Sequence, residues 1–66
     1  MNFGKNTQKL REERKLTQCE LADRVGVTSV MINRIENGSK IPSLLLSLSI
    51  ANVLNTTVDT LANATL

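Results

Sequence analysis

Three observations predict an all-α fold, a compact bundle of five short helices. Apolar residues recur at three- and four-residue spacings along most of the chain, which is the period of a helix with one buried face. Ser and Thr stand where these segments begin, and Gly and Asn where they end, as is usual at helix boundaries. The 66 residues allow one domain, residues 1–66, whose small core needs regular packing or a partner subunit.

The first two helices are predicted from apolar spacing and from their boundary residues. We expect the first to span about residues 5–14, with Leu10 as its apolar anchor. The second begins after Thr17, which has Glu20 three residues later, the spacing of a capping box. Gly26 ends it, because helices commonly stop at a residue that tolerates positive φ. Its inner side is formed by Leu21, Ala22 and Val25.

The third helix is predicted between two boundary signals. Thr28 or Ser29 is its expected cap, and Asn37-Gly38 is its expected end. The residues expected to face inward are Ile32 and Ile35, with Val27 and Met31 near the same side.

The last two helices follow Pro42, which forces an extended approach and so favours the start of a new helix. We expect the fourth helix at residues 43–54 and a last helix from Val58 to about residue 63, capped by Thr57. The inner face of the fourth helix is expected to carry Leu44, Leu48, Ala51 and Leu54, with Ile50 and Val53 beside it.

The composition argues against an enzyme, a metal centre and a membrane protein. The chain has no His, no Tyr, no Cys/His cluster and no Gly-rich phosphate loop, so we expect no catalytic residues, metal or cofactor. No apolar run is longer than the three residues of Leu44–Leu46, which cannot span a membrane. The polar N-terminus does not resemble a signal peptide, and the single Cys19 cannot form an internal disulfide, which fits a reducing cytoplasm.

Charge is unevenly distributed along the chain. All eight Lys and Arg residues lie between Lys5 and Lys40, together with five of the six acidic residues, and the only charge after Lys40 is Asp59. This division suits an anion-facing first part and a protein-facing last part. A solvated surface would explain the same distribution equally well.

Residues 17–37 match a helix-turn-helix, with the turn at Gly26 and the small Ala22 where the helices cross. When the apolar positions of its second helix face inward, one outward stripe remains, because positions one, four and five apart are neighbours on a helix. In a recognition helix such a stripe contacts base edges in the DNA major groove. The expected base-reading residues are Thr28, Ser29, Val30, Asn33 and Arg34.

These side chains suit base recognition. Arg34 can donate two hydrogen bonds to guanine, and Asn33 can pair with adenine. Ser29 can donate or accept, and Val30 or the Thr28 methyl group can pack on a thymine methyl. A solvent-facing helix would explain Arg34 or Asn33 alone. An apolar side chain such as Val30 gains little stability on a solvent-exposed face, so its outward position favours a contact. The alternatives to a DNA contact are a subunit contact or simple exposure.

The spacing of short motifs between Leu10 and Leu61 is specific in combination, although each motif alone is weak. The motifs are Leu10-Arg11, Leu16-Thr17-Gln18, Glu20-Leu21-Ala22, Gly26-Val27, Ile35-Glu36-Asn37-Gly38, Pro42-Ser43, Ile50-Ala51 and Thr57-Val58-Asp59. In these motifs the chain resembles the lambda-repressor/Cro-type helix-turn-helix family, also called the XRE type. The resemblance implies a five-helix DNA-binding domain of the lambda-repressor-like type.

The resemblance also implies roles for individual residues. Gln18, Asn37 and Lys40 correspond to family residues that hold DNA phosphates. Arg11 and Glu36 correspond to a family pair that forms a salt bridge between the first and third helices. Arg11 is therefore expected to be structural first and a phosphate contact second. Four further cations are expected to be solvated rather than specific contacts, although any of them can add to the general positive field: Lys5, Lys9, Arg14 and Lys15.

The sequence departs from the family pattern in the fourth helix and at Cys19. Leu45 and Leu46 stand where polar residues are common, and Ser47 stands where a core Leu is frequent. Either the helix is shifted in register and buries a different face, or an exposed Leu patch serves dimerisation. Cys19 is interpreted as a surface thiol rather than a redox-sensitive group, because no neighbouring pattern activates it.

We therefore expect a sequence-specific transcriptional regulator, a cytoplasmic repressor that binds an inverted-repeat operator in double-stranded DNA as a homodimer. No small-molecule ligand is expected. The expected dimer surface consists of Leu45, Leu46, Asn55, Thr57, Val58, Leu61 and Leu66.

Three alternatives differ in class. A protein-interaction module on the same fold, such as an antitoxin-like partner, would bind DNA weakly and without salt dependence. A small enzyme conflicts with the missing His and catalytic clusters. A non-specific nucleic-acid binder conflicts with the modest net charge of +2 and the lack of stacking aromatics.

Overall fold

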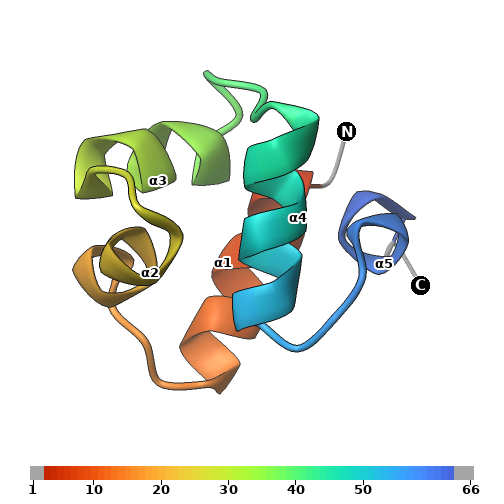
Figure 1. Cartoon of the computed structure of the whole chain (residues 1–66), viewed down its shortest axis with the longest axis horizontal. Helices are drawn as coiled ribbons and strands as arrows, with labels where there is room; N and C mark the ends of the chain where they lie inside the picture. Colours follow the sequence, from red (N-terminus) through yellow and green to blue (C-terminus); the bar gives the residue numbers. More distant parts are fainter. Residues whose placement is uncertain (1–2, 64–66) are drawn as a thin grey trace.

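The computed structural model describes the backbone of residues 3–63 and the side chains of residues 3–62, and all regular structure in this range is helical (Figure 1). The helices are α1 (Phe3–Glu13), α2 (Gln18–Val25), α3 (Ser29–Glu36), α4 (Leu44–Val53) and α5 (Val58–Asn63). The predicted all-α class with five helices is therefore confirmed. Within the described range, none of the helices is long and apolar enough to cross a membrane.

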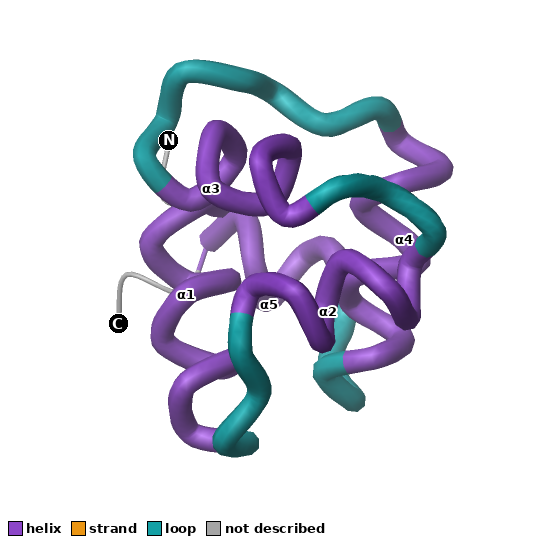
Figure 2. The backbone as a smooth tube through the Cα atoms, turned by 90° about the vertical axis from the view of Figure 1, so that its left-hand side faces the viewer, coloured by secondary structure: helices purple, strands orange, loops and turns teal. Residues whose placement is uncertain are grey.

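The helices form a compact body of 27 × 23 × 19 Å. Figure 1 shows α4 in front of α1 at the centre, with α2 and α3 on one side and α5 on the other. In the view turned by 90°, α3 lies in the upper part of the molecule, below a loop that forms the upper edge (Figure 2). α3 packs on α1 and α2, while α4 packs on α2 and α5. The outer side of α3 is consequently left uncovered.

α1 begins earlier than the sequence predicts, at Phe3, because this side chain is buried in the core. Gly4 allows the close approach, since a Cβ there would collide with the carbonyl oxygens of Ile35 and Glu36 in α3. Leu10, the predicted anchor, is only half-buried. The inward face of α1 instead follows a four-residue spacing and consists of Phe3, Thr7 and Arg11.

The predicted boundaries of α2 and α3 are confirmed. The Thr17 hydroxyl accepts a hydrogen bond from Glu20 N at 3.0 Å, and the Glu20 carboxylate accepts one from Thr17 N at 2.8 Å, so the capping box is complete. Gly26 ends α2 with φ of 80°. For α3 the cap is Thr28, whose hydroxyl accepts from Met31 N at 3.2 Å.

The predicted inner face of α4 is partly wrong. Leu44 and Leu48 are 70% and 51% exposed, while Ser47 lies in the core. Ser47 can be buried because its hydroxyl donates to the Ser43 carbonyl oxygen at 2.8 Å, which replaces the hydrogen bond that it would otherwise make with water. Because Ser47 is buried at the position where the family often has a core Leu, α4 keeps the register of the family and the shifted-register interpretation is wrong. The other interpretation, an exposed Leu patch, remains. The buried residues of the α4 segment are Ser47, Ile50, Ala51 and Leu54.

α5 closes the core, and this corrects one predicted surface residue. Leu61 is fully buried, so its side chain is enclosed by its own chain and cannot form part of a dimer surface. The Asn6 amide donates to the Leu61 carbonyl oxygen at 2.6 Å and ties α5 to α1. Leu66, also predicted at the dimer surface, lies outside the described residues. The apolar core consists of Phe3, Leu21, Ala22, Ile32, Ile35, Ile50, Ala51, Leu54 and Leu61.

Candidate nucleic-acid interface

The turn between α2 and α3 fixes how the third helix is presented. Gly26 N and Val27 N both donate to the Ala22 carbonyl oxygen, at 2.8 and 3.0 Å, which closes the end of α2. Ile32 and Ile35 are then fully buried against the rest of the bundle. Because these two residues fix the rotation of α3, its opposite side must face outward.

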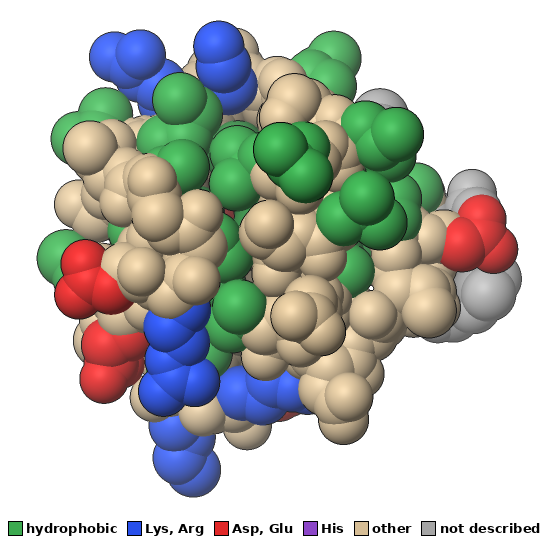
Figure 3. Space-filling model, viewed as in Figure 1, with side chains coloured by type: hydrophobic (Ala, Val, Ile, Leu, Met, Phe, Trp, Pro, Cys, Tyr) green, Lys and Arg blue, Asp and Glu red, His purple; other side chains and the backbone are tan. Residues whose placement is uncertain are grey.

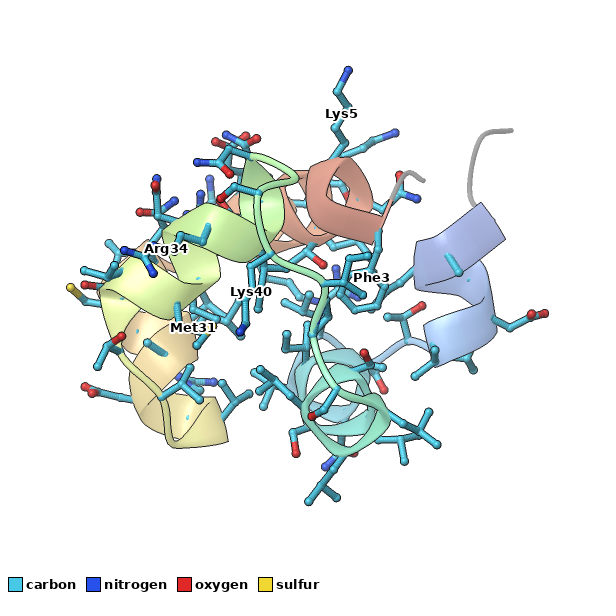
Figure 4. The ribbon with its side chains drawn as sticks, turned by 90° about the horizontal axis from the view of Figure 1, so that it is seen from above. Phe3, Lys5, Met31, Arg34 and Lys40 are labelled. Carbon is cyan, nitrogen blue, oxygen red and sulfur yellow. The ribbon has the colours of Figure 1, made fainter. Side chains whose placement is uncertain are left out.

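The outward side of α3 carries the five predicted base-reading residues. Thr28, Asn33 and Arg34 are exposed, Val30 is 57% exposed, and Ser29 is half-buried. The Thr28 oxygen is used by the helix cap, so toward a ligand Thr28 offers its methyl group and its hydroxyl proton. Seen from above, Arg34 and Met31 project from this helix (Figure 4).

Arg11 lies in the interior of the molecule, which agrees with the structural role that the resemblance implied as its main one. Its Nε and NH2 donate to the two carboxylate oxygens of Glu36, at 2.7 and 3.1 Å. Its NH1 donates to the Leu16 carbonyl oxygen at 2.7 Å. Hydrogen bonding to Glu36 raises the pKa of Arg11, and burial opposes this effect. Arg11 is only 8% exposed and each of its guanidinium nitrogens has a partner within the protein, which fits the expected structural role. Its second role, as a phosphate contact, stays a prediction.

Gln18 is held by the same carboxylate. Its Nε2 donates to Glu36 Oε1 at 3.0 Å, so one buried carboxylate orients side chains from both α1 and α2. An amide nitrogen carries two hydrogens, and this bond uses one of them. The second remains available to an acceptor at the start of α2, where the helix dipole also favours an anion. The sequence did not reveal the link between Gln18 and Glu36, because it joins residues 18 positions apart.

Asn37 and Lys40 lie in the connection that follows α3. The Asn37 side chain accepts a hydrogen bond from Ser39 N at 2.9 Å, and its Nδ2 lies 3.5 Å from Asn33 Oδ1. Ser39 N and Lys40 N both donate to the Arg34 carbonyl oxygen, at 3.0 and 3.2 Å. Both predicted phosphate contacts are exposed. These bonds hold them close to the C-terminal end of the outward stripe.

The rest of the surface differs from this stripe. Ile41, Leu44, Leu45 and Leu48 are exposed, and we call these four residues the α4 patch. Figure 3 shows apolar side chains gathered over α4, with basic side chains at the upper edge of the same face. Cys19 is an exposed, free thiol. Among the described residues, no group of His, Cys, Asp or Glu is arranged to hold a metal ion.

A helix-turn-helix family model matches residues 8–61. The sequence is 36% identical over 57 residues to an uncharacterised HTH-type transcriptional regulator, YqaE, of Bacillus subtilis, covering 86% of this chain and 49% of that protein. It is 51% identical over 39 residues to the HTH-type transcriptional repressor RghR of the same organism, covering 59% of this chain and 29% of that protein. The chain thus spans half or less of the length of these relatives.

Solved structures agree with the sequence comparisons. The DNA-binding domain of the P22 c2 repressor is similar with a TM-score of 0.89 and 26% identity, covering 94% of this chain and 82% of that one. SinR, a master regulator for biofilm formation solved in complex with DNA, is similar with a TM-score of 0.86 and 27% identity, covering 92% and 98%. The matched family, together with a fold like that of the lambda-type repressors, identifies the chain as a member of the helix-turn-helix family of the XRE type.

Proposed function

We propose that this protein is a sequence-specific transcriptional repressor that binds an inverted-repeat operator in double-stranded DNA as a homodimer. The observation that carries the proposal is the outward stripe of α3, in which polar and apolar side chains are held exposed by a fully buried opposite face. The relative RghR, named as a repressor, and the similar structures of the P22 c2 repressor domain and SinR support the same function. Such a regulator would act in the cytoplasm, and the proposal involves no cofactor.

The stripe would read bases in the major groove. Arg34 is exposed and makes no side-chain hydrogen bond within the described residues, so its guanidinium is free to donate twice to a guanine. Asn33 offers both an amide donor and an acceptor, which suits adenine. Val30 is 57% exposed in the monomer, and a thymine methyl would cover part of its apolar surface.

The ends of the stripe would bind phosphates. Gln18 presents its remaining amide hydrogen from the first turn of α2, and Asn37 and Lys40 stand at the C-terminal end of α3. Contacts of this kind fix the position of the protein on the duplex and carry no sequence information of their own. Base reading would then fall to the residues between them.

The α4 patch supports dimerisation. Three large aliphatic side chains, Leu44, Leu45 and Ile41, are each at least 70% exposed, and Leu48 adjoins them at 51%. Such a cluster is unfavourable in water and typical of a protein contact. A twofold axis brings identical surfaces together, and the α4 patch carries no charge that would oppose this. The other predicted interface residues that reach the surface are Leu46, Asn55, Thr57 and Val58.

Selection from a random duplex library at a stated salt concentration tests the function. Enrichment of an inverted repeat would support sequence-specific binding by a symmetric dimer, and the half-site spacing should be about 10 base pairs or a multiple. Failure to enrich any sequence would overturn the proposal. The antitoxin-like interaction module would then be the better explanation, with the α4 patch as its binding surface.

A further inference from the structure

The first turn of α1 brings a cation beside the end of α3. Gly4 packs directly on the last carbonyl groups of α3, where a Cβ would lie only 2.9 Å from the Glu36 oxygen. The next residue, Lys5, is exposed. It lines a cavity of about 190 Å³ together with residues of both helices, namely Gly4, Glu36, Asn37 and Gly38. A side chain from the start of the chain thus adjoins a predicted phosphate contact.

The cavity continues the outward stripe of α3. Ser29, Asn33 and Asn37 follow one another at four-residue spacing, so they lie in one row along the helix. The side chains of Asn33 and Asn37 meet at 3.5 Å, which shows that the row is continuous. Because Asn37 and Lys5 line the same cavity, the end of this row lies beside Lys5.

The charge of Lys5 is not neutralised by the protein. The ion pairs among the described residues join Arg11 to Glu12 and Arg11 to Glu36, and neither involves Lys5. Of the residues that the structure describes, Glu36 is the only one with a carboxylate lining the cavity, and its oxygens already accept hydrogen bonds from Arg11 and Gln18. The ammonium of Lys5 is consequently left to bind an anion from outside.

Lys40 belongs to the connection between α3 and α4, and seen from above its side chain and that of Lys5 project in opposite directions (Figure 4). Lys40 lines a different cavity, of about 260 Å³, which shares Gly4 and Gly38 with the first one. A helix in the major groove has one phosphate backbone on each side of it. Two cations that flank the end of such a helix can therefore face two different strands.

We propose that Lys5 binds the DNA phosphate backbone on the side of α3 opposite to Lys40, so that α1 contributes a second grip on the duplex. This inference rests on the proposed DNA binding. It changes the expectation that Lys5 is merely solvated. The sequence did not reveal this position, because it depends on α1 beginning at Phe3 and on Gly4 packing against α3.

The test is the salt dependence of binding to a random-sequence duplex of about 30 base pairs, between about 50 and 200 mM salt. Lys5→Gln should reduce the slope of log affinity against log salt by about one per bound subunit. Lys5→Arg should restore the slope, because it restores the charge. Lys15→Gln is the matched control, since it removes the same charge from just beyond the opposite end of α1 and should leave the slope unchanged.

A purely structural role predicts another result. Lys5 lies near the C-terminal end of α3, where a cation can also stabilise the helix through its dipole. In that case Lys5→Gln would lower the thermal unfolding midpoint and leave the salt slope equal to that of the Lys15→Gln control, which would overturn the proposal. If the wild-type protein bound no duplex at all, the proposed function would fail together with this inference. If the wild-type protein bound DNA and Lys5→Gln left the salt slope unaltered, only the role of Lys5 as a phosphate contact would be rejected.

Discussion

Arg11 and Glu36 form a two-bond ion pair between α1 and α3, with Nε to Oε2 at 2.7 Å and NH2 to Oε1 at 3.1 Å. Their side chains are 9% and 3% exposed, so the pair is nearly shielded from water. The Glu36 carboxylate also orients Gln18, which places one structural pair directly behind a proposed phosphate contact. The fold and the proposed interface therefore share this carboxylate.

Removing one partner of this pair should destabilise the protein strongly. Arg11→Met leaves the Glu36 carboxylate buried and without its guanidinium, and should lower the free energy of unfolding by about 3 kcal/mol. Urea unfolding followed by circular dichroism measures this change. Arg14→Met is a suitable control, because Arg14 is exposed and should change stability by less than about 0.5 kcal/mol. Equal effects of the two substitutions would refute the structural role of Arg11.

The capping box of α2 should make stability depend on pH. Hydrogen bonds from the Thr17 backbone and then from its side chain lower the pKa of Glu20 below its ordinary value of 4.5. A lowered folded pKa stabilises the protein above the unfolded value, and this contribution disappears as the pH falls through the folded value. Glu20→Gln should therefore lower the unfolding midpoint near neutral pH and have little effect in acid. A loss of the same size at both pH values would contradict the role of the carboxylate.

Thr7 is a position where substitution should stabilise the fold. Its hydroxyl oxygen is fully buried and has no hydrogen-bond partner among the described residues. Thr7→Val keeps the shape of the side chain and removes the unpaired hydroxyl, so it should raise the free energy of unfolding by about 1 kcal/mol. Thr7→Ser serves as the control, because it retains the hydroxyl, loses the methyl group and should lower stability. A destabilising effect of Thr7→Val would mean that the hydroxyl is satisfied in solution.

The α4 patch should determine the oligomeric state. Leu45 is 75% exposed, so Leu45→Glu should not disturb the core, but two copies would bring like charges together across a twofold axis. We expect sedimentation to show a monomer for this variant and a dimer for the wild type. Gln8→Glu adds the same charge to an exposed site on α1 and should leave the dimer intact. A dimer that survives Leu45→Glu would place the interface elsewhere.

Local signals allowed most of the helix boundaries to be predicted from the sequence. Helix caps involve residues only a few positions apart, so their patterns are visible in the sequence. The examples are Thr17 with Glu20, Thr28 with Met31 N, and Gly26. Contacts between distant segments are different. Only the family resemblance indicated that Arg11 meets Glu36, and nothing indicated that Gln18 joins them.

The inner face of α4 could not be predicted because apolar residues surround this helix. Leucines occupy positions 44, 45, 46 and 48, so several faces satisfy the apolar period. Burial was decided by packing on α2 and α5, which selected the row of Ser47, Ile50 and Ala51. Ser47 fits in that buried row because it is small and its hydroxyl donates a hydrogen bond to the helix backbone. Leu61 was misplaced for a related reason, since an apolar residue near the end of the chain fits a core and an interface equally well.

The central claim is that the outward stripe of α3 reads bases while its flanking residues hold phosphates. Library selection repeated with Arg34→Ala tests it most directly. We expect the same inverted repeat with one base position per half-site relaxed, and an affinity for the wild-type operator reduced by about 1–3 kcal/mol per half-site. Lys40→Gln should weaken all duplexes alike and retain the full preference. If Arg34→Ala weakened every duplex equally and left all base preferences unchanged, α3 would not be reading sequence through Arg34, and the account would be contradicted.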